Sequence, residues 1–233
     1  MIWNPDIECM PREQMRELQG EKLRKIVAHA YANSPFYRKR FDEHGVHPSD
    51  IRSIDDIVKL PFTIKKDLRD NYPFGLMAVP MTDIIRLHAS SGTTGKPIVV
   101  GYTGRDLDNW SEAVARCLTG YGLGKNDLVQ ISYGYGLFTG GLGAHAGVQK
   151  IGATVIPTSS GNTQKQIQLM QDFGTTALAC TPSYAMYMAD ELRKAGVDID
   201  SLKLRVGIFG AEPWTGAMRQ ELQNKLHIKA YDI

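Results

Sequence analysis

The sequence predicts an α/β fold in which a mostly parallel sheet is flanked by helices. From residue 128 onward, short apolar runs typical of buried strands alternate with longer segments of helical periodicity. Glycines close two of these helical segments, at Gly174 and Gly196. Strands that alternate with helices build parallel sheets through right-handed crossovers. We expect this α/β part over residues 83–233, preceded by a helical and loop-rich segment over residues 1–82.

The N-terminal segment contains one clear helix. Apolar residues recur at helical spacing over residues 11–32, and the sequence Asn33–Ser34–Pro35 ends the pattern. The apolar stripe consists of Met15, Leu18, Leu23, Ile26, Val27, Ala30 and Tyr31. Residues 33–82 are interrupted by prolines and show no period, so we expect irregular structure there.

The second part opens with two strands, expected at residues 84–89 and 98–103. Thr103 and Asp106 form a T-x-x-D capping box that predicts the start of a helix. The later strands are expected at 128–132, 153–157, 176–180, 204–210 and 229–233. The helices between them are a short apolar one before Gly152 and three at 162–173, 183–195 and 215–226.

Composition excludes several classes of protein. The net charge of +2 gives no broad basic surface for nucleic acid or an anionic membrane. No apolar run approaches the roughly 20 residues that span a bilayer. The three cysteines form no CxxC pair, so neither a disulfide framework nor a zinc site is expected. We therefore expect a cytoplasmic protein with no nucleic-acid or membrane partner.

One loop, SSGTTGKP at residues 90–97, gathers hydroxyls, glycines and one lysine. Backbone N–H groups, hydroxyls and an ammonium together favour a phosphate. The loop is not a P-loop, because Ser90 stands where that motif has glycine and Pro97 follows Lys96. It also joins two strands, so no helix N-terminus follows it. A plain surface hairpin is the alternative interpretation.

With this loop the chain resembles the adenylate-forming superfamily, and more closely the phenylacetate–CoA ligases. The resemblance runs from about Leu18 to the C-terminus. It rests on SPFYRKRF, LPFTIKKDLRDNYPFG, HASSGTTGKP, YGYGLFTGG and TPSY in this order. Lys96 departs from the wider superfamily, where many members place the lysine after the proline.

The resemblance implies an AMP-forming ligase that uses ATP, Mg²⁺ and coenzyme A to activate phenylacetate or a related aryl acid. It assigns the loop to the phosphates, with Lys96, Thr93 and Thr94 as catalytic residues and Thr93 or Thr94 as a Mg²⁺ ligand. The residues expected to bind the nucleotide are Ser90, Ser91, Gly92, Thr93, Thr94, Gly95, Lys96, Gly210, Ala211, Glu212, Pro213 and Asp232.

The glycine- and aromatic-rich segment at residues 133–141 is the expected acyl pocket. On composition alone a packed turn is equally consistent with it; the resemblance favours a slot lined by Tyr135, Phe138 and Gly141. His145 has two interpretations, a group near the carboxylate or a structural histidine. His44 and His47, and the basic run at residues 38–40, are read as surface residues.

The chain ends in the predicted strand 229–233, just before the place where a further site loop belongs in such a sheet. We therefore expect a fragment whose partners are the rest of the same protein, a small aryl acid and a second copy in a homodimer. The alternative function is a non-catalytic module that binds nucleotide or aryl acid.

Overall fold

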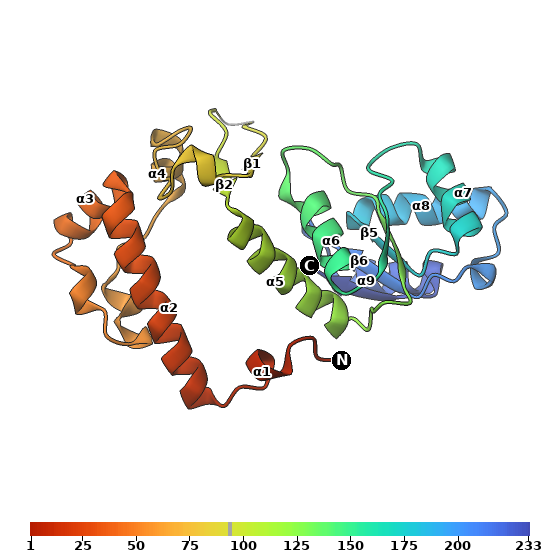
Figure 1. Ribbon diagram of the computed structural model, residues 1–233. Helices are drawn as coiled ribbons and strands as arrows, with labels where there is room; N and C mark the ends of the chain where they lie inside the picture. The colour runs from red at the N-terminus through yellow and green to blue at the C-terminus, as the bar shows by residue number, and fades with distance from the viewer. Residues whose placement is uncertain (93–94) are drawn as a thin grey trace. The chain divides into compact units, whose positions relative to one another are not determined.

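The computed structural model describes residues 1–92 and 95–233 and divides into two compact units. One unit is Asn4–Leu107, and the other is Met1–Trp3 with Asp108–Ile233, so the division falls within helix α5, Gly104–Gly120 (Figure 1). The boundary between the units, at residues 107 and 108, thus lies further along the chain than the expected boundary at residue 82. The strand pair after residue 83 packs on the segment before it, since Met77 Sδ lies 2.8 Å from the position of a Cβ on Gly101.

The first unit is mainly helical, with α1 (Pro5–Glu8), α2 (Arg12–Asn33), α3 (Pro35–Glu43) and α4 (Lys65–Asp70). Its 3₁₀ turns are η1 (Pro48–Asp50), η2 (Ile54–Lys59) and η3 (Met81–Asp83). The expected irregularity of residues 33–82 is therefore wrong in part. Pro35 begins α3 and does not interrupt it, because N–H groups in the first turn of a helix make no hydrogen bond within the helix, so proline loses none there.

A small core holds this helical unit together. Its buried members are Leu23, Val27, Phe41, Val46 and Ile51, which come from α2, α3 and the turns that follow. The predicted stripe on α2 is correct at Leu23 and Val27, but Ile26 is 59% exposed. The stripe is thus narrower than the sequence indicated, since short elements cover only one side of the helix.

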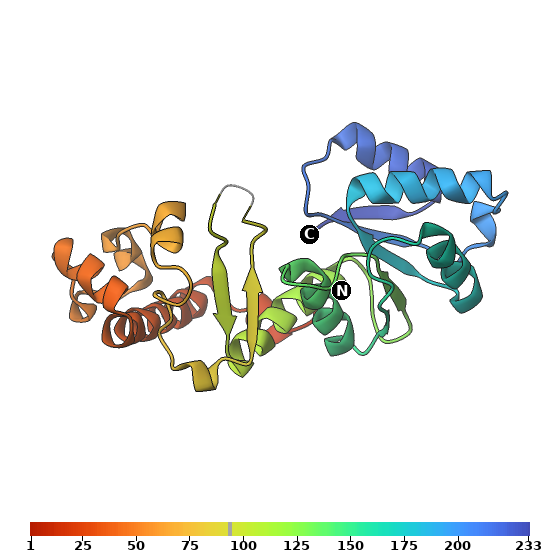
Figure 2. The same cartoon turned by 90° about the horizontal axis from the view of Figure 1, so that it is seen from above.

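Strands β1 (Arg86–Ala89) and β2 (Val99–Tyr102) form an antiparallel hairpin in the first unit (Figure 2). Beyond the ladder, Ser90 N–H donates to the carbonyl of Ile98 at 2.9 Å. The predicted strand–loop–strand arrangement is confirmed. Thr103 and Asp106 make the predicted capping box at the start of α5, with the Thr103 N–H 2.9 Å from Asp106 Oδ2.

The second unit contains a five-stranded sheet, β4-β3-β5-β6-β7, whose strands are all parallel. The strands are β3 (Leu128–Ile131), β4 (Thr154–Ile156), β5 (Ala177–Cys180), β6 (Val206–Phe209) and β7 (Lys229–Asp232). The helices are α6 (Thr139–Lys150), α7 (Thr163–Phe173), α8 (Pro182–Lys194) and α9 (Gly216–Leu226), with the turn η4 (Ile199–Ser201). The predicted fold class is confirmed.

Helices cover both faces of this sheet (Figure 2). Helices α5 and α6 pack on one face around Leu118, Val148 and Ile131. Helices α7, α8 and α9 pack on the other around Met170, Met188 and Leu222. No helix in the described part of the chain is long and apolar enough to cross a membrane.

The strand order places a topological switch between β3 and β5. From β3 the chain crosses to β4 on one side, and from β4 it returns to β5 on the other. In open parallel sheets the loops diverge at such a point and leave a crevice at the carboxyl ends of the strands. This edge of the sheet is where a ligand site is expected.

Candidate functional site

A cavity of about 420 Å³ opens at the carboxyl edge of the sheet. Its floor is made by residues of β3, β5 and β6, its sides by α5 and α6, and its rim by the loops after β3 and β6 and by Ile233. Its lining includes Trp110, Val114, Tyr133, Gly134, Phe138 and Gly141. The cavity therefore lies beside the β3–β5 switch and is mostly apolar, which suits a small ligand with an apolar body.

The close approach of α5 and α6 shapes the side wall. A Cβ on Gly143 would lie 2.4 Å from the Trp110 indole, and one on Gly147 would lie 2.2 Å from Val114 Cγ1. Glycine at both positions lets α6 approach α5 closely enough for the tryptophan to form a wall. Gly141 serves the rim in the same way, since its Cβ would lie 2.8 Å from the carbonyl oxygen of Gly134.

The three expected acyl-pocket residues take different positions. Phe138 and Gly141 belong to the cavity lining, whereas Tyr135 does not, and Tyr133 lies in the lining instead. Tyr133 donates its hydroxyl proton to the carbonyl of Cys180 at 2.7 Å, and burial raises its pKa. Tyr133 therefore stays neutral near pH 7 and lines the cavity as an uncharged aromatic side chain.

Tyr135 is paired with His145. The Tyr135 hydroxyl lies 3.2 Å from His145 Nδ1, and the two rings meet edge-on with centroids 5.9 Å apart. Burial raises the pKa of Tyr135 to about 12. His145 therefore has a hydrogen-bond partner within its own unit. Of the two interpretations, a group near the carboxylate or a structural histidine, this contact favours the structural one.

The loop after β6 carries the residues expected to meet the adenine. Gly210 lies against the end of β7, where a Cβ would be 2.4 Å from the carbonyl oxygen of Ile233. Ala211 has a left-handed backbone, with φ of 69°, and lines the cavity. Pro213 follows on the exposed side of the loop. The loop thus borders the same cavity as the aromatic segment.

Glu212 anchors this loop to the start of α8. Its Oε1 accepts a hydrogen bond of 2.7 Å from the backbone N–H of Ser183, in the first turn of that helix. A carboxylate at a helix N-terminus is stabilised by the helix dipole. Asp232, at the end of β7, accepts from Trp214 Nε1 at 2.8 Å and pairs with Arg219 at 3.3 Å. Both carboxylates therefore fix loop geometry through contacts within the unit.

The expected phosphate loop lies in the other unit, at the end of the β1–β2 hairpin. Thr93 and Thr94 lie outside the described residues. Gly92 and Gly95 have φ of 67° and 130°, and Gly95 N–H donates to the carbonyl of Gly92 at 3.0 Å. Positive φ at two nearby glycines is the backbone conformation that anion-binding loops require.

Side chains of this loop are exposed. Ser90, Ser91 and Lys96 are all open to solvent, although Ser90 Oγ also accepts from the N–H of Ile98 at 2.9 Å. Lys96 Nζ lies 5.7 Å from the centroid of the Tyr72 ring, within reach of a cation–π contact. The cation–π contact thus holds the ammonium near the loop, where among the described residues no carboxylate forms an ion pair with it.

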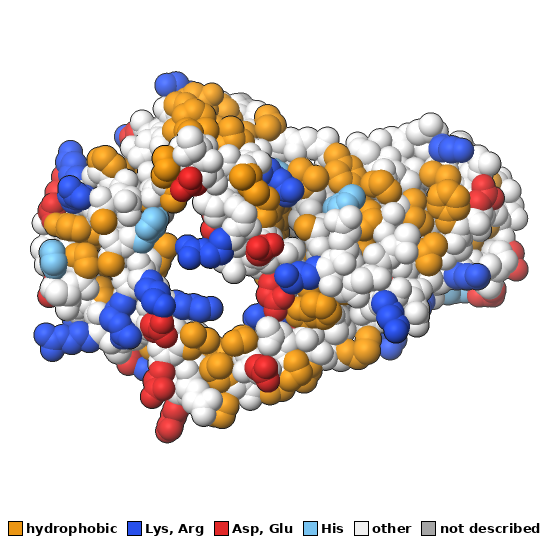
Figure 3. All heavy atoms as spheres, viewed as in Figure 1, with side chains coloured by type: hydrophobic (Ala, Val, Ile, Leu, Met, Phe, Trp, Pro, Cys, Tyr) orange, Lys and Arg blue, Asp and Glu red, His pale blue; other side chains and the backbone are white. Residues whose placement is uncertain are grey.

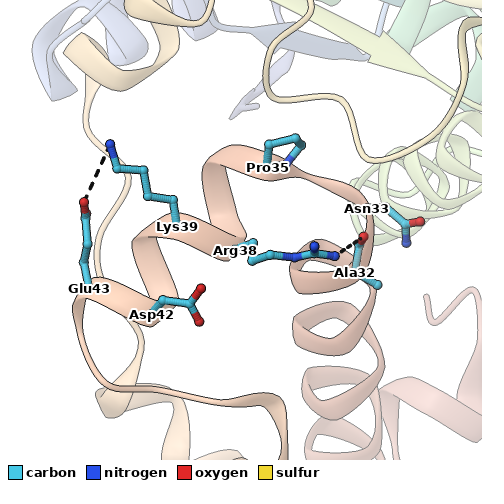
Figure 4. Close-up of a pocket in the computed structure, with 7 residues that line it drawn as sticks. All are labelled: Ala32, Asn33, Pro35, Arg38, Lys39, Asp42 and Glu43. Carbon is cyan, nitrogen blue, oxygen red and sulfur yellow. Dashed lines mark hydrogen bonds and ion pairs between the residues drawn. The ribbon is translucent and has the colours of Figure 1, made fainter.

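A second hollow, beside α2 and α3, is lined by charged side chains (Figure 4). Arg38 donates to the carbonyls of Tyr31 and Ala32, and Lys39 pairs with Glu43 at 3.8 Å. Arg38 and Lys39 are exposed, in agreement with the surface interpretation, whereas Arg40 is half-buried and pairs with Asp67 at 2.7 Å, which the sequence did not indicate. Among the described residues no cluster of three or more His, Cys, Asp or Glu could hold a metal ion.

Sequence reasoning missed the α5 wall of the cavity. Trp110 and Val114 stand at helical spacing after the capping box of Thr103 and Asp106, and such periodicity does not distinguish a core contact from a ligand contact. Ser183 belongs to the recognised segment TPSY. Its hydrogen bond to Glu212 joins residues 29 positions apart, so no local pattern in the sequence predicts it.

Solved structures identify the class. The chain superimposes on 2-hydroxyisobutyryl-CoA ligase in complex with 2-HIB-AMP and CoA, with a TM-score of 0.93, 28% identity, and coverage of 99% of this chain and 51% of that one. The postadenylation state of the same ligase gives a TM-score of 0.91. No protein-family model matches the chain. The fold is that of the CoA ligases that form acyl-adenylates.

Curated relatives identify the family within that class. The chain is 55% identical to the phenylacetate-coenzyme A ligase of Aromatoleum evansii and 53% identical to that of Escherichia coli, over 97% of its own length in both cases. It spans 52% of each of these relatives, about half their length. The chain belongs to the phenylacetate–CoA ligase family.

Proposed function

We propose that the chain provides the acid-binding and nucleotide-binding part of an AMP-forming ligase that converts phenylacetate or a related aryl acid into its coenzyme A thioester. The observation that carries this proposal is the apolar, aromatic-rimmed cavity at the β3–β5 switch, in a chain whose relatives are named phenylacetate-coenzyme A ligases. A flat apolar acid fits such a lining, because its ring replaces water against Trp110 and Tyr133 while its carboxylate stays at the open rim.

The reaction has two displacement steps. A carboxylate oxygen of the acid attacks the α-phosphorus of ATP, and pyrophosphate leaves. The thiol sulfur of coenzyme A then attacks the acyl carbon of the mixed anhydride, its proton passes to solvent or a base, and AMP leaves. In the first step negative charge grows on the leaving pyrophosphate, so donors already aimed at it lower the barrier.

The residues present fit parts of this chemistry. The glycines of residues 90–96 and the exposed Lys96 ammonium would receive the phosphates, and the 210–213 loop would lie against the base. We also propose that the hydroxyls of Thr93 and Thr94 bind phosphate and that one of them binds Mg²⁺. Mg²⁺, when bound, would neutralise charge on the phosphates; the described residues offer no cluster of carboxylates to hold it.

The remaining parts of the proposal concern the whole protein. Its partners would be the aryl acid, ATP, coenzyme A and the rest of the same polypeptide, and its location the cytoplasm. A homodimer is a further proposal, which light scattering of the full-length protein in solution would test.

The decisive experiment supplies the full-length protein with ATP, Mg²⁺, coenzyme A and a panel of aryl and alkyl acids. We expect release of AMP and pyrophosphate together with a thioester, with phenylacetate or a near relative as the best acid. Release of ADP would exclude adenylation, and binding of acid without turnover would favour the non-catalytic module.

A further inference from the structure

A polar network lies buried within the second unit, on the side of the sheet that α7 covers. Gln130 and Ser132 on and after β3, Gln166 on α7 and Thr175 before β5 are at most 4% exposed. Polar groups buried in a core are costly unless every donor and acceptor is satisfied. This network meets that condition around a single side chain, the amide of Gln166.

The Gln166 amide uses both of its ends. Its Oε1 accepts from Ser132 Oγ at 2.5 Å and lies 3.2 Å from Thr158 Oγ1 and 3.3 Å from Gln130 Nε2. Its Nε2 donates to the backbone carbonyls of Ser159 at 2.9 Å and Gly161 at 2.7 Å. One side chain therefore ties the end of β3 to the loop at residues 158–162.

That loop has an unusual backbone. Ser159, Gly161 and Asn162 all have left-handed conformations, with φ of 62°, 84° and 47°. Two of the three are not glycine, and such residues hold this conformation only where the surroundings impose it. The two hydrogen bonds from Gln166 Nε2 to the loop carbonyls restrain this backbone, together with the bond from the Ser159 N–H to the carbonyl of Ile131 at 3.0 Å.

The loop in turn supports the rim of the cavity. Ser159 Oγ lies 3.5 Å from the backbone N of Tyr135, and Ser160 Oγ lies 3.6 Å from the position of a Cβ on Gly134. Gly134 and its neighbour Tyr133 line the cavity. A chain of contacts thus runs from Gln166 through the 158–162 loop to the cavity rim.

We propose that Gln166 is a positioning residue for the acid: it touches no ligand but fixes the 158–162 loop, which holds the Tyr133–Gly134 rim in the shape that accepts the acyl group. This inference rests on the proposed function, because the cavity is taken as the acid site. Loosening the loop should weaken binding of the acid and change the selectivity among acids, while leaving use of ATP and coenzyme A nearly unchanged.

The main test is Gln166→Glu in the full-length protein. Glutamate keeps the length and one acceptor oxygen, but its second oxygen replaces the N–H donors and is directed at the carbonyls of Ser159 and Gly161. We expect the KM for phenylacetate, and its Kd measured by calorimetry, to rise about tenfold, with the KM values for ATP and coenzyme A changed less than about twofold. Gln168→Glu is the matched control, an exposed glutamine on the same helix, and it should behave like the unmodified protein.

A second variant keeps the inference testable if Gln166→Glu does not fold. Ser159→Gly permits the left-handed backbone and removes the hydroxyl beside the Tyr135 N–H, so the thermal midpoint should hold while the KM and Kd for the acid rise severalfold.

Each outcome decides the matter. A folded Gln166→Glu protein with a lower thermal midpoint but unchanged acid binding would show a purely structural role and overturn the inference. Unchanged acid binding in Ser159→Gly would overturn it if the first variant is unfolded. If the unmodified protein binds the acid but forms no AMP, the proposed function is contradicted. The role of Gln166 can still be tested then, because the Kd for the acid is measured without turnover. An unmodified protein that binds no aryl acid overturns both.

Discussion

At the scale of single residues, Lys96 is the clearest test of the phosphate loop. Its ammonium is exposed and lies 5.7 Å from the centroid of the Tyr72 ring, and no carboxylate among the residues that the structure describes forms an ion pair with it. We predict that Lys96→Ala in the full-length protein raises the KM for ATP roughly ten- to a hundredfold, the usual value of a charge-assisted contact. The KM for the acid should change much less. Steady-state kinetics with each substrate varied in turn would measure both.

The matched control for this prediction is Lys65→Ala. Lys65 is exposed and lies in the same unit, at the start of α4. It should leave both KM values unchanged. Unaltered ATP kinetics in Lys96→Ala would mean that the glycine N–H groups and the hydroxyls bind the phosphates without the lysine.

A second residue-scale prediction concerns the dependence of stability on pH. Asp127 is 5% exposed, and both of its carboxylate oxygens lie 2.7 Å from Arg205 Nη2. Burial raises the pKa of Asp127, but hydrogen bonds from Thr176, the Gly124 N–H and Arg205 outweigh burial and leave the pKa below its ordinary value. A carboxyl with a lowered pKa stabilises the fold above its unfolded pKa of about 3.9, and this contribution disappears as pH falls further.

We therefore predict that Asp127→Asn lowers the free energy of unfolding at pH 7 by roughly 1.5–3 kcal/mol, the range for hydrogen bonds to charged groups. At pH 3 the difference from the unmodified protein should shrink. Urea denaturation at both pH values measures this. Asp172→Asn, an exposed position on α7, is the control and should show no loss at either pH; an equal loss by Asp127→Asn at both would contradict the argument.

At the scale of elements, local signals in the sequence predicted most of the fold. The capping box of Thr103 and Asp106 starts α5, and Gly174 closes α7 with a left-handed backbone. These features depend on residues a few positions apart. The α3 helix was missed because Pro35 reads as a break unless its place in the first turn is known.

The site was less predictable than the fold, for a physical reason. From the glycine-rich segment we predicted Tyr135, Phe138 and Gly141 as lining residues. Phe138 and Gly141 do line the cavity, but the tyrosine in the lining is Tyr133. Which of two tyrosines faces a cavity depends on how α6 approaches α5. That approach is fixed by the contacts of Gly143 with Trp110 and of Gly147 with Val114, 33 positions apart in each pair, and helical periodicity alone does not contain them.

The α5–α6 contact leads to an element-scale prediction. A methyl group on Gly147 would lie 2.2 Å from Val114 Cγ1, so Gly147→Ala must push the helices apart. We expect a loss of roughly 1–3 kcal/mol in the free energy of unfolding and weaker binding of the acid, because the cavity wall moves with α5. Urea denaturation and calorimetry measure the two effects.

Two further variants separate steric conflict from helix propensity. Gly140→Ala is the control on the same helix, where nothing lies within 4 Å of the new methyl group, and it should be neutral or stabilising by up to about 1 kcal/mol. Adding Val114→Ala to Gly147→Ala should restore part of the lost stability. If the double variant loses as much free energy of unfolding as the two single variants lose together, or more, a direct steric conflict is contradicted.

At the scale of the whole molecule, the residues proposed to bind the substrates come from both compact units. The phosphate loop belongs to residues 4–107, whereas the cavity and the 210–213 loop belong to residues 108–233. Hydrophobic side chains are also open on the first unit, where Val58 and Phe62 are 85% and 88% exposed, and Figure 3 shows such side chains gathered near α4 and the hairpin. Apolar surface of this kind is typical of a protein that makes further contacts.

The last prediction concerns the 233 residues expressed by themselves. Although they carry the phosphate loop and the cavity, we expect no measurable thioester formation from ATP, coenzyme A and phenylacetate. Catalysis of this kind requires two substrates held in register and shielded from water, and loss of positioning groups removes orders of magnitude in rate. The chain spans only about half of its curated relatives, 52%, so much of the positioning would come from outside it.

The measurement is a turnover assay on the purified 233-residue chain beside the full-length protein, with circular dichroism to show that the shorter chain is folded. Pyrophosphate binding by calorimetry provides an independent readout. Weak binding should survive, because the donors at residues 90–96 lie close together in sequence, and it should fall in Lys96→Ala but not in Lys65→Ala. Thioester formation at a rate near that of the full-length protein would show that these two units alone hold all the catalytic groups.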